Sequence, residues 1–199
     1  MERVSADRKI VALGAAALGA AILIFGIARG FFYSWTGEIG VQHPAFSPAV
    51  ESSVPERIMI PKIHVDAPVD EVGVTYKGNM GTPKILSHTG WYRYGTVPGE
   101  LGSAVIDGHV DNGFNLPGVF ARLNELASGD DIFVRTKGGT TLHFIVVDIR
   151  RYPYKEVPLD MLFLKDDAPR LNLITCEGEW IPEEETDAGR LVIFTRLVE

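Results

Sequence analysis

Residues 171–178 read Leu171-Asn172-Leu173-Ile174-Thr175-Cys176-Glu177-Gly178 and contain the one cysteine of the chain. Apolar and β-branched residues precede the cysteine and a glycine follows it shortly, which predicts a strand with a thiol at its end. In an exported domain, a cysteine that has no partner for a disulfide in its own chain is a candidate nucleophile. Free cysteine is also among the most buried residue types, so a structural thiol is the alternative.

The N-terminal region indicates export. Ile10–Ala28 is a run of nineteen residues without a charged side chain, and as a helix it would span roughly 28 Å, close to the hydrocarbon thickness of a bilayer. Three basic residues precede this run and only Arg29 directly follows it, so the positive-inside rule places residues 1–9 in the cytoplasm. We expect a single-pass protein of the cell membrane whose main domain is extracellular. A cleaved signal peptide is the alternative, although the run exceeds the usual apolar region of about 7–15 residues.

Beyond the anchor, the sequence divides into a linker and one domain. Residues 29–55 form a juxtamembrane segment and linker with Pro, Ser and Gly and no sustained period. Residues 56–199 have the size of one ordinary domain. They carry the whole net charge of −7, because residues 1–55 hold four basic and four acidic side chains. An acidic exported domain is a poor candidate for binding nucleic acid.

Short strand-like runs punctuated by Gly, Pro, Asn and Asp recur through this domain, and long helical periodicity is absent. The runs are Arg57–Ile60, Val65–Val69, Ser103–Val110, Asp131–Thr136, Thr141–Arg150, Leu171–Cys176 and Leu191–Val198. Lys137-Gly138-Gly139-Thr140 predicts a hairpin turn. The most helical segment is Gly118–Ala127, and a shorter turn is expected near Leu159–Leu164. The pattern favours an all-β barrel or sandwich that closes its own edges, with one or two short helices.

A nucleophilic thiol needs a group that transfers protons, and His109 is the best placed of the five histidines. It ends the apolar run of residues 103–110, where a scaffold commonly presents catalytic groups, and Gly108 beside it leaves room for close approach. Asp111 falls on the same face of an extended chain, where it could orient His109 or cap the following loop. His88 lies in a loop next to aromatic residues and is a reserve candidate.

Arg190 is the candidate cation for stabilising an oxyanion. It opens the last strand-like run after the acidic segment Glu179–Gly189, so a salt bridge to one of those carboxylates is the alternative. If the runs around Cys176 and after Arg190 pair as antiparallel neighbours, the two side chains meet at the same end of the sheet. Arg196 would be displaced by roughly 20 Å toward the other end. The acidic segment lacks the alternating ligand spacing of a calcium loop, so we expect no bound metal.

These residues together resemble the sortases, cysteine transpeptidases of Gram-positive surfaces. The resemblance rests on Leu173-Ile174-Thr175-Cys176, preceded by Gly108-His109 and followed by an arginine at the last strand, and it covers Pro55 to Glu199. The stretches PGELGSAVIDGHVD, GVFARLNELASGDDIFV and RLVIFTRLV resemble the actinobacterial branch called class E or class F. The resemblance implies a closed eight-stranded sortase-type β-barrel. Asn172-Leu173 stands where the family usually has Thr-Leu, which bears on substrate preference more than on chemistry.

The resemblance also implies an activity that requires no cofactor. Cys176 would attack the threonine carbonyl of an LPxTG-like sorting signal and cleave it between Thr and Gly through a thioester. His109 would act as general acid and base, and Arg190 would stabilise the oxyanion. Thr175, Leu173 and Asp111 are candidate substrate-binding residues. The implied partners are exported proteins with a C-terminal sorting signal and an amine acceptor, either a lipid-linked peptidoglycan precursor or a pilin lysine.

Two other functions stay open at the level of the residues. One is an exported cysteine hydrolase, in which water and not an amine resolves the thioester. The other is a membrane-tethered, non-catalytic β-domain that binds a wall component and keeps Cys176 as a structural residue. Labelling of Cys176 by thiol reagents in the folded protein would argue against the second.

Overall fold

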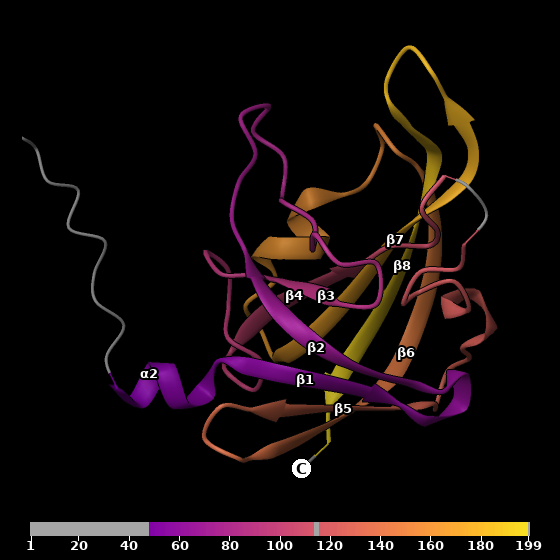
Figure 1. The fold of residues 1–199 in the computed structure, drawn as a ribbon. Helices are drawn as coiled ribbons and strands as arrows, with labels where there is room; N and C mark the ends of the chain where they lie inside the picture. Colours follow the sequence, from indigo (N-terminus) through magenta and orange to yellow (C-terminus); the bar gives the residue numbers. More distant parts are fainter. Residues whose placement is uncertain (1–47, 114–115, 199) are drawn as a thin grey trace, which may run out of the picture. The chain divides into compact units, whose positions relative to one another are not determined.

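The computed structural model of the protein describes residues 48–113 and 116–198, which lie within the compact unit Phe46–Glu199. Its strands close into a barrel in the order β1-β2-β3-β4-β7-β8-β6-β5, with β1 pairing with β5 (Figure 1). The predicted all-β, closed eight-stranded barrel is therefore confirmed. The strands are β1 (Pro55–Ile60), β2 (Val65–Val72), β3 (Thr89–Tyr92), β4 (Gly102–Gly108), β5 (Asp131–Thr136), β6 (Thr141–Pro153), β7 (Pro169–Ile181) and β8 (Thr186–Leu197).

Helical structure is short throughout the described residues. It consists of α2 (Pro48–Ser53), the 3₁₀ turns η1 (Pro61–Ile63) and η2 (Leu123–Glu125), and the π-helical turn η3 (Asp160–Leu164). The turn expected near residues 159–164 is confirmed, and so is the hairpin turn between β5 and β6, where Gly139 has a φ of 85°.

The helix expected at Gly118–Ala127 is wrong except for the single turn η2. Phe120, Leu123 and Leu126 are buried, as their helical spacing predicted. However, the backbone N–H groups at the start of the segment bond outside it: Gly118 donates to Val110 O at 2.8 Å and Phe120 to His109 O at 2.9 Å. The start of this segment is therefore not helical, because its amides are hydrogen-bonded to the residues that follow β4.

Sequence reasoning also missed β3 and underestimated β7 and β8. Strand β3 has only four residues and includes Gly90, so its propensity signal is weak. The acidic segment Glu179–Gly189 is mostly strand, because β7 and β8 continue into a hairpin whose tip is residues 182–185. A register shift between Glu177 and Trp180 accompanies this extension.

The end of the expected linker is structured. Helix α2 lies within residues 29–55, and Val54 is 3% exposed in the barrel core. The amide of Lys137 donates to Val54 O at 2.9 Å, which fastens this segment to the β5–β6 hairpin. Within the two described ranges no helix is both long and apolar enough to span a bilayer, and the span predicted at Ile10–Ala28 lies outside them.

Alternate residues of β4, β7 and β8 face opposite sides of the barrel wall, as the period of a strand requires. The residues that face the interior core include Ala104, Ile106, Leu171, Leu173, Leu191 and Ile193. A second set packs on the outer face as an apolar cluster: Val105, Ile174, Val192 and Phe194, with Leu162 and Phe163 of η3. Cys176 is in step with Ile174, so its thiol also lies on the outer face, beside the apolar cluster.

Candidate active site

Cys176 and Arg190 lie directly opposite each other on the antiparallel strands β7 and β8. Opposite residues of a strand pair share a face, so the thiol and the guanidinium lie on the outer face together. The predicted antiparallel pairing of these two residues is confirmed, but the expectation that they lie at strand ends is wrong, because β7 continues to Ile181 and β8 begins at Thr186. Arg196 lies opposite Ile145, and it is exposed.

The Arg190 guanidinium is held by the hairpin that carries it. Its Nη1 donates to the main-chain oxygens of Asp187 at 3.1 Å and Gly189 at 2.7 Å, and its Nη2 donates to Thr186 Oγ1 at 2.6 Å. The Arg190 Cζ is 5.9 Å from the centre of the Tyr154 ring. The alternative, a salt bridge from Arg190 to a carboxylate of the acidic segment, is not found among the described residues. The guanidinium is positioned by neutral acceptors and keeps its charge unpaired.

His109 directly follows β4, which pairs with β7 on the side away from β8. Strand β4 runs parallel to β7, and Asp107 beside Ile174 is the last pair of their register, so continuing that register would bring His109 level with Cys176. Thr175 Oγ1 donates to Gly108 O at 2.7 Å and holds the end of β4 against β7. The His109 Nε2 lies 2.8 Å from Pro83 O. A carbonyl only accepts, so Nε2 carries the hydrogen and Nδ1 is the basic nitrogen of the neutral ring. Within the described residues this is the one hydrogen bond of the imidazole, and it does not involve the thiol.

The structure distinguishes between the two roles considered for Asp111. Its Oδ1 accepts a hydrogen bond from the Gly113 amide at 2.7 Å, so Asp111 caps the following loop, and Pro83 orients His109. The reserve histidine, His88, is paired with Asp70 through Nδ1 and Oδ2 at 3.0 Å.

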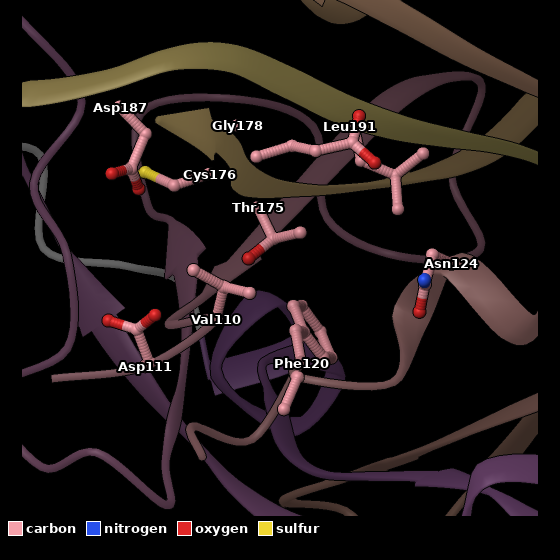
Figure 2. A pocket seen from close by; sticks show the side chains of 11 residues that line it. Val110, Asp111, Phe120, Asn124, Thr175, Cys176, Gly178, Asp187 and Leu191 are labelled. Atoms are coloured by element: carbon pink, nitrogen blue, oxygen red, sulfur yellow. The ribbon is translucent and has the colours of Figure 1, made fainter. Parts of the chain in front are cut away.

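A pocket of about 150 Å³ opens beside Cys176 at this end of the barrel (Figure 2). Two of the three predicted substrate-binding residues, Thr175 and Asp111, line it. The third expectation is wrong, because Leu173 is fully buried and faces the interior core. The sequence pattern could not assign the face until the pairing of β7 was known. The other lining residues are Val110, Phe120, Ala121, Asn124, Glu177, Gly178, Asp187 and Leu191.

Sequence reasoning missed two carboxylates that act on the thiol. Burial raises the pKa of the Cys176 thiol above its usual value; Arg190 opposes this, while Asp187 and Asp107 raise that pKa further. Figure 2 shows the Asp187 carboxylate beside the Cys176 sulfur. In the resting protein the thiol is therefore protonated at neutral pH. Asp107 could have been noticed, since it is an acid inside an apolar run and lies two residues from His109. Asp187 could not be told apart from the other acids of its segment.

Asp107 is a buried carboxyl group on the outer face of β4. It is 8% exposed, and its Oδ1 has no hydrogen-bond partner. Its neighbour on β3 is Gly90, where an added Cβ would lie 2.5 Å from Asp107 Oδ1. Burial raises the pKa of Asp107 from 3.8 to about 8. The side chain is therefore a neutral acid at pH 7.

This pKa predicts how folding stability depends on pH. Between about pH 4 and 8 the unfolded state has an ionised Asp107 and the folded state a protonated one. The folded state then binds more protons, so stability falls as the pH rises and levels off above pH 8. We expect Asp107→Asn to remove this dependence. Relative to the variant, the wild-type free energy of unfolding should fall by up to about 4 kcal/mol from pH 5 to pH 8.

Denaturant unfolding at each pH measures the difference between wild type and Asp107→Asn. Asp166→Asn, which removes an exposed carboxylate, serves as the matched control and should follow the wild-type curve. Parallel curves for wild type and Asp107→Asn would contradict the assignment of a buried neutral acid.

Gly118 fixes the position of His109. A Cβ added at Gly118 would overlap the carbonyl oxygen of His109 and come 2.9 Å from its Cβ. Because this contact is with backbone, it cannot be relieved by rotating a side chain. We expect Gly118→Ala to reduce enzymatic turnover about 100-fold, since displacement of a reacting group by about 1 Å has effects of that size. Gly113 lies in the same connection, with a positive φ of 76° and open space around it. Gly113→Ala is therefore a control that strains the backbone without this overlap. Equal turnover in both variants would contradict the prediction.

The closed barrel, with a cysteine and an arginine paired on β7 and β8 and a histidine directly after β4, defines a class of cysteine-dependent barrel enzymes. Residues 58–198 match the profile of the sortase domain. The match spans more than half of the chain, and the chain belongs to the sortase family, a family of cysteine transpeptidases. No curated protein sequence is significantly similar to it.

Solved structures of sortases share the fold. Sortase A from Corynebacterium diphtheriae has a TM-score of 0.57 and 23% identity, over 73% of this chain and 61% of that chain. Sortase C-1 from Actinomyces oris has a TM-score of 0.56 and 26% identity, over 72% of this chain and 71% of that one. Sortase C from Clostridium perfringens has a TM-score of 0.55 and 23% identity, over 75% and 72%. This chain thus covers about three fifths of the Corynebacterium protein.

Asn172, which stands where the family usually has threonine, supports the wall of the apolar cluster. It is fully buried on β7, and its Nδ2 donates to Leu162 O of η3 at 2.7 Å. The amide thereby fastens the β6–β7 connection over the outer face of the sheet. Asn172 is four residues from Cys176 along β7, so this departure from the family pattern affects the shape of the surface beside the thiol and not the thiol itself.

Proposed function

We propose that this protein is a sortase that cleaves an LPxTG-like sorting signal between Thr and Gly and transfers the acyl group to an amine. One observation carries the proposal: Cys176 and Arg190 are opposite each other across β7 and β8, and His109 follows β4 directly on the other side of β7. This arrangement supports the action of a nucleophile, a cation and a proton-transferring group on a single peptide carbonyl.

In the first half-reaction, the Cys176 sulfur bonds to the threonine carbonyl carbon. The carbonyl oxygen becomes an oxyanion, which Arg190 stabilises. His109 gives a proton to the departing glycine nitrogen as the carbon–nitrogen bond breaks, and a thioester remains on Cys176. Because the resting thiol is protonated, its proton must leave before attack, and in this proposal His109 receives it. For this step His109 exchanges the Pro83 carbonyl for the reacting groups.

The apolar cluster on the outer face supports an apolar, extended peptide as the acyl donor. Ile174, Tyr92 and Phe163 are partly buried members of this cluster, and Ile174 is next to Cys176 on the same face of β7. The leucine and proline of a sorting signal would pack here while the threonine carbonyl reaches the thiol. Burial of such side chains contributes about 25 cal/mol for each Å² removed from water.

In the second half-reaction, an amine from a cell-wall precursor or a pilin lysine attacks the thioester, and the same His109 removes its proton. The proposal includes the localisation expected from the sequence, with Ile10–Ala28 as a single membrane anchor and an extracellular catalytic domain. It also includes the class E or class F branch, on the motifs quoted above. An anchored enzyme meets exported substrates at a raised effective concentration.

The decisive experiment supplies the full-length protein with a library of five-residue signal peptides and a glycine-type amine, with mass spectrometry as the readout. The expected result is a thioester on Cys176 and an amide product for LPxTG-like members. Products of hydrolysis alone would favour a cysteine hydrolase. A thiol that forms no adduct with any peptide in the library would contradict the proposal.

A further inference from the structure

The Asp187 carboxylate occupies an unusual position for an acid. It lies beside the Cys176 sulfur and lines the same pocket (Figure 2). Within the described residues, no lysine, arginine or histidine forms an ion pair with it. Arg190, only three residues away, donates to the main-chain oxygen of Asp187 and to Thr186 and not to the carboxylate, whose hydrogen-bond contact is with the Cys176 thiol. Nearby acids of the same hairpin are paired: Glu184 with Lys155 at 2.6 Å and Glu185 with Lys77 at 3.1 Å.

This position works against the first half-reaction. A negative charge next to the thiol raises the thiol pKa and disfavours the thiolate. A neutral asparagine could fill the same space without this effect. The carboxylate is therefore better explained by the second half-reaction, in which the thiolate is already consumed in the thioester and a cationic amine must approach.

The surroundings of Cys176 differ on its two sides. The apolar cluster, with Ile174 and Val192, adjoins it along the outer face. The pocket beside Cys176 has a mixed lining, with apolar side chains such as Val110 and Phe120 and polar ones such as Asp111, Asn124 and Asp187. Of these, Asp187 is the one drawn next to the sulfur (Figure 2). The apolar cluster suits the peptide donor, which leaves the pocket, with its carboxylates, for the acceptor.

We propose that Asp187 is a specificity-determining residue of the second half-reaction, whose carboxylate selects a positively charged amine as the acceptor. The inference rests on the proposed function. The acceptor arrives as an ammonium ion beside Asp187. Its nitrogen bonds to the acyl carbon, the carbon–sulfur bond breaks and an amide forms. Of the two protons that the ammonium loses, one ends on the Cys176 sulfur and the other leaves to solvent through His109. Anionic nucleophiles are repelled.

The test uses two methanethiosulfonate reagents of opposite charge, one with a trimethylammonium group and one with a sulfonate, on the full-length protein. In each case the Cys176 sulfur forms a mixed disulfide and methanesulfinate leaves. Wild type is expected to react faster with the cation. Asp187→Asn should lower the cation-to-anion rate ratio about tenfold, which corresponds to about 1.4 kcal/mol, the order of magnitude expected for a unit charge within a few Å of the reagent charge. A change in thiol pKa alters both rates equally and cancels in the ratio.

Glu183→Gln is the matched control, since Glu183 is an exposed acid at the tip of the same hairpin. This variant should keep the wild-type ratio. An unchanged ratio in Asp187→Asn would overturn the proposal, because the carboxylate would then exert no field at the reacting sulfur. This result does not depend on any peptide substrate, so it is separable from a failure of the proposed function.

A second measurement follows the acyl-enzyme. Glycinamide is cationic near neutral pH and hydroxylamine is neutral, and both can resolve a thioester. Asp187→Asn is expected to slow release by glycinamide about tenfold while leaving release by hydroxylamine unchanged. Equal slowing with both amines would assign Asp187 a structural role and contradict selection by charge. If no peptide forms a thioester in wild type, the proposed function fails, and the reagent ratio still decides the role of Asp187.

Discussion

Replacing Cys176 by alanine is expected to abolish both thioester formation and transfer to an amine. The variant lacks the atom that forms the covalent intermediate, so turnover should fall by about 10⁴-fold or more, as for other catalytic nucleophiles. The fold should persist, because the side chain is partly exposed on the outer face and does not belong to the interior core. The free energy of unfolding should change by less than about 1 kcal/mol.

Two measurements check this prediction. Mass spectrometry after incubation with donor peptide should show no adduct on Cys176→Ala, and denaturant unfolding should match wild type. Cys176→Ser provides a nearly isosteric control with a much weaker nucleophile, and it should also be inactive. Retained transfer in Cys176→Ala would remove the proposed mechanism.

Replacing Arg190 by alanine is expected to reduce transfer by about 10²–10³-fold. Loss of one donor to an oxyanion has an effect of this size in other acyl-transfer sites. The same change should raise the pKa of the Cys176 thiol, because Arg190 is the group that lowers it in the wild-type protein. Alkylation of Cys176 at neutral pH should therefore also slow down. Arg190→Lys should keep most of the alkylation rate, since the positive charge remains. It should lose transfer, since lysine lacks the planar guanidinium with its several N–H donors.

Arg196 offers the matched control for Arg190. It lies on the same strand, opposite Ile145, and it is exposed. Arg196→Ala should retain both the transfer rate and the alkylation rate within about twofold, as for surface substitutions away from special features. If the two alanine variants lose transfer equally, the effect belongs to the stability of β8 and not to the guanidinium beside Cys176.

The sequence predicted most of the strands, because alternation and turn residues are local signals. Runs such as Asp131–Thr136 match β5 residue for residue. The misses have local causes as well. Strand β3 is short and contains Gly90, and the expected helix at Gly118–Ala127 has its amides bonded to the chain after β4. The partners of the Gly118 and Phe120 amides, Val110 and His109, precede the segment, so the apolar spacing within the segment does not reveal these bonds.

The amino-acid sequence by itself determined the all-β class, a strand as the place of the one thiol, and Cys176, His109 and Arg190 as the candidate catalytic residues. Only the tertiary structure decided which face each side chain occupies. In the structure, Leu173 faces the core and Asp111 accepts a hydrogen bond within its own loop. His109 is hydrogen-bonded to Pro83, and Asp187 lines the pocket beside the Cys176 sulfur. The physical reason is that strand periodicity is local, whereas burial, charge and hydrogen-bond partners depend on which strands and loops meet. Their partners come from segments that are far apart in the sequence.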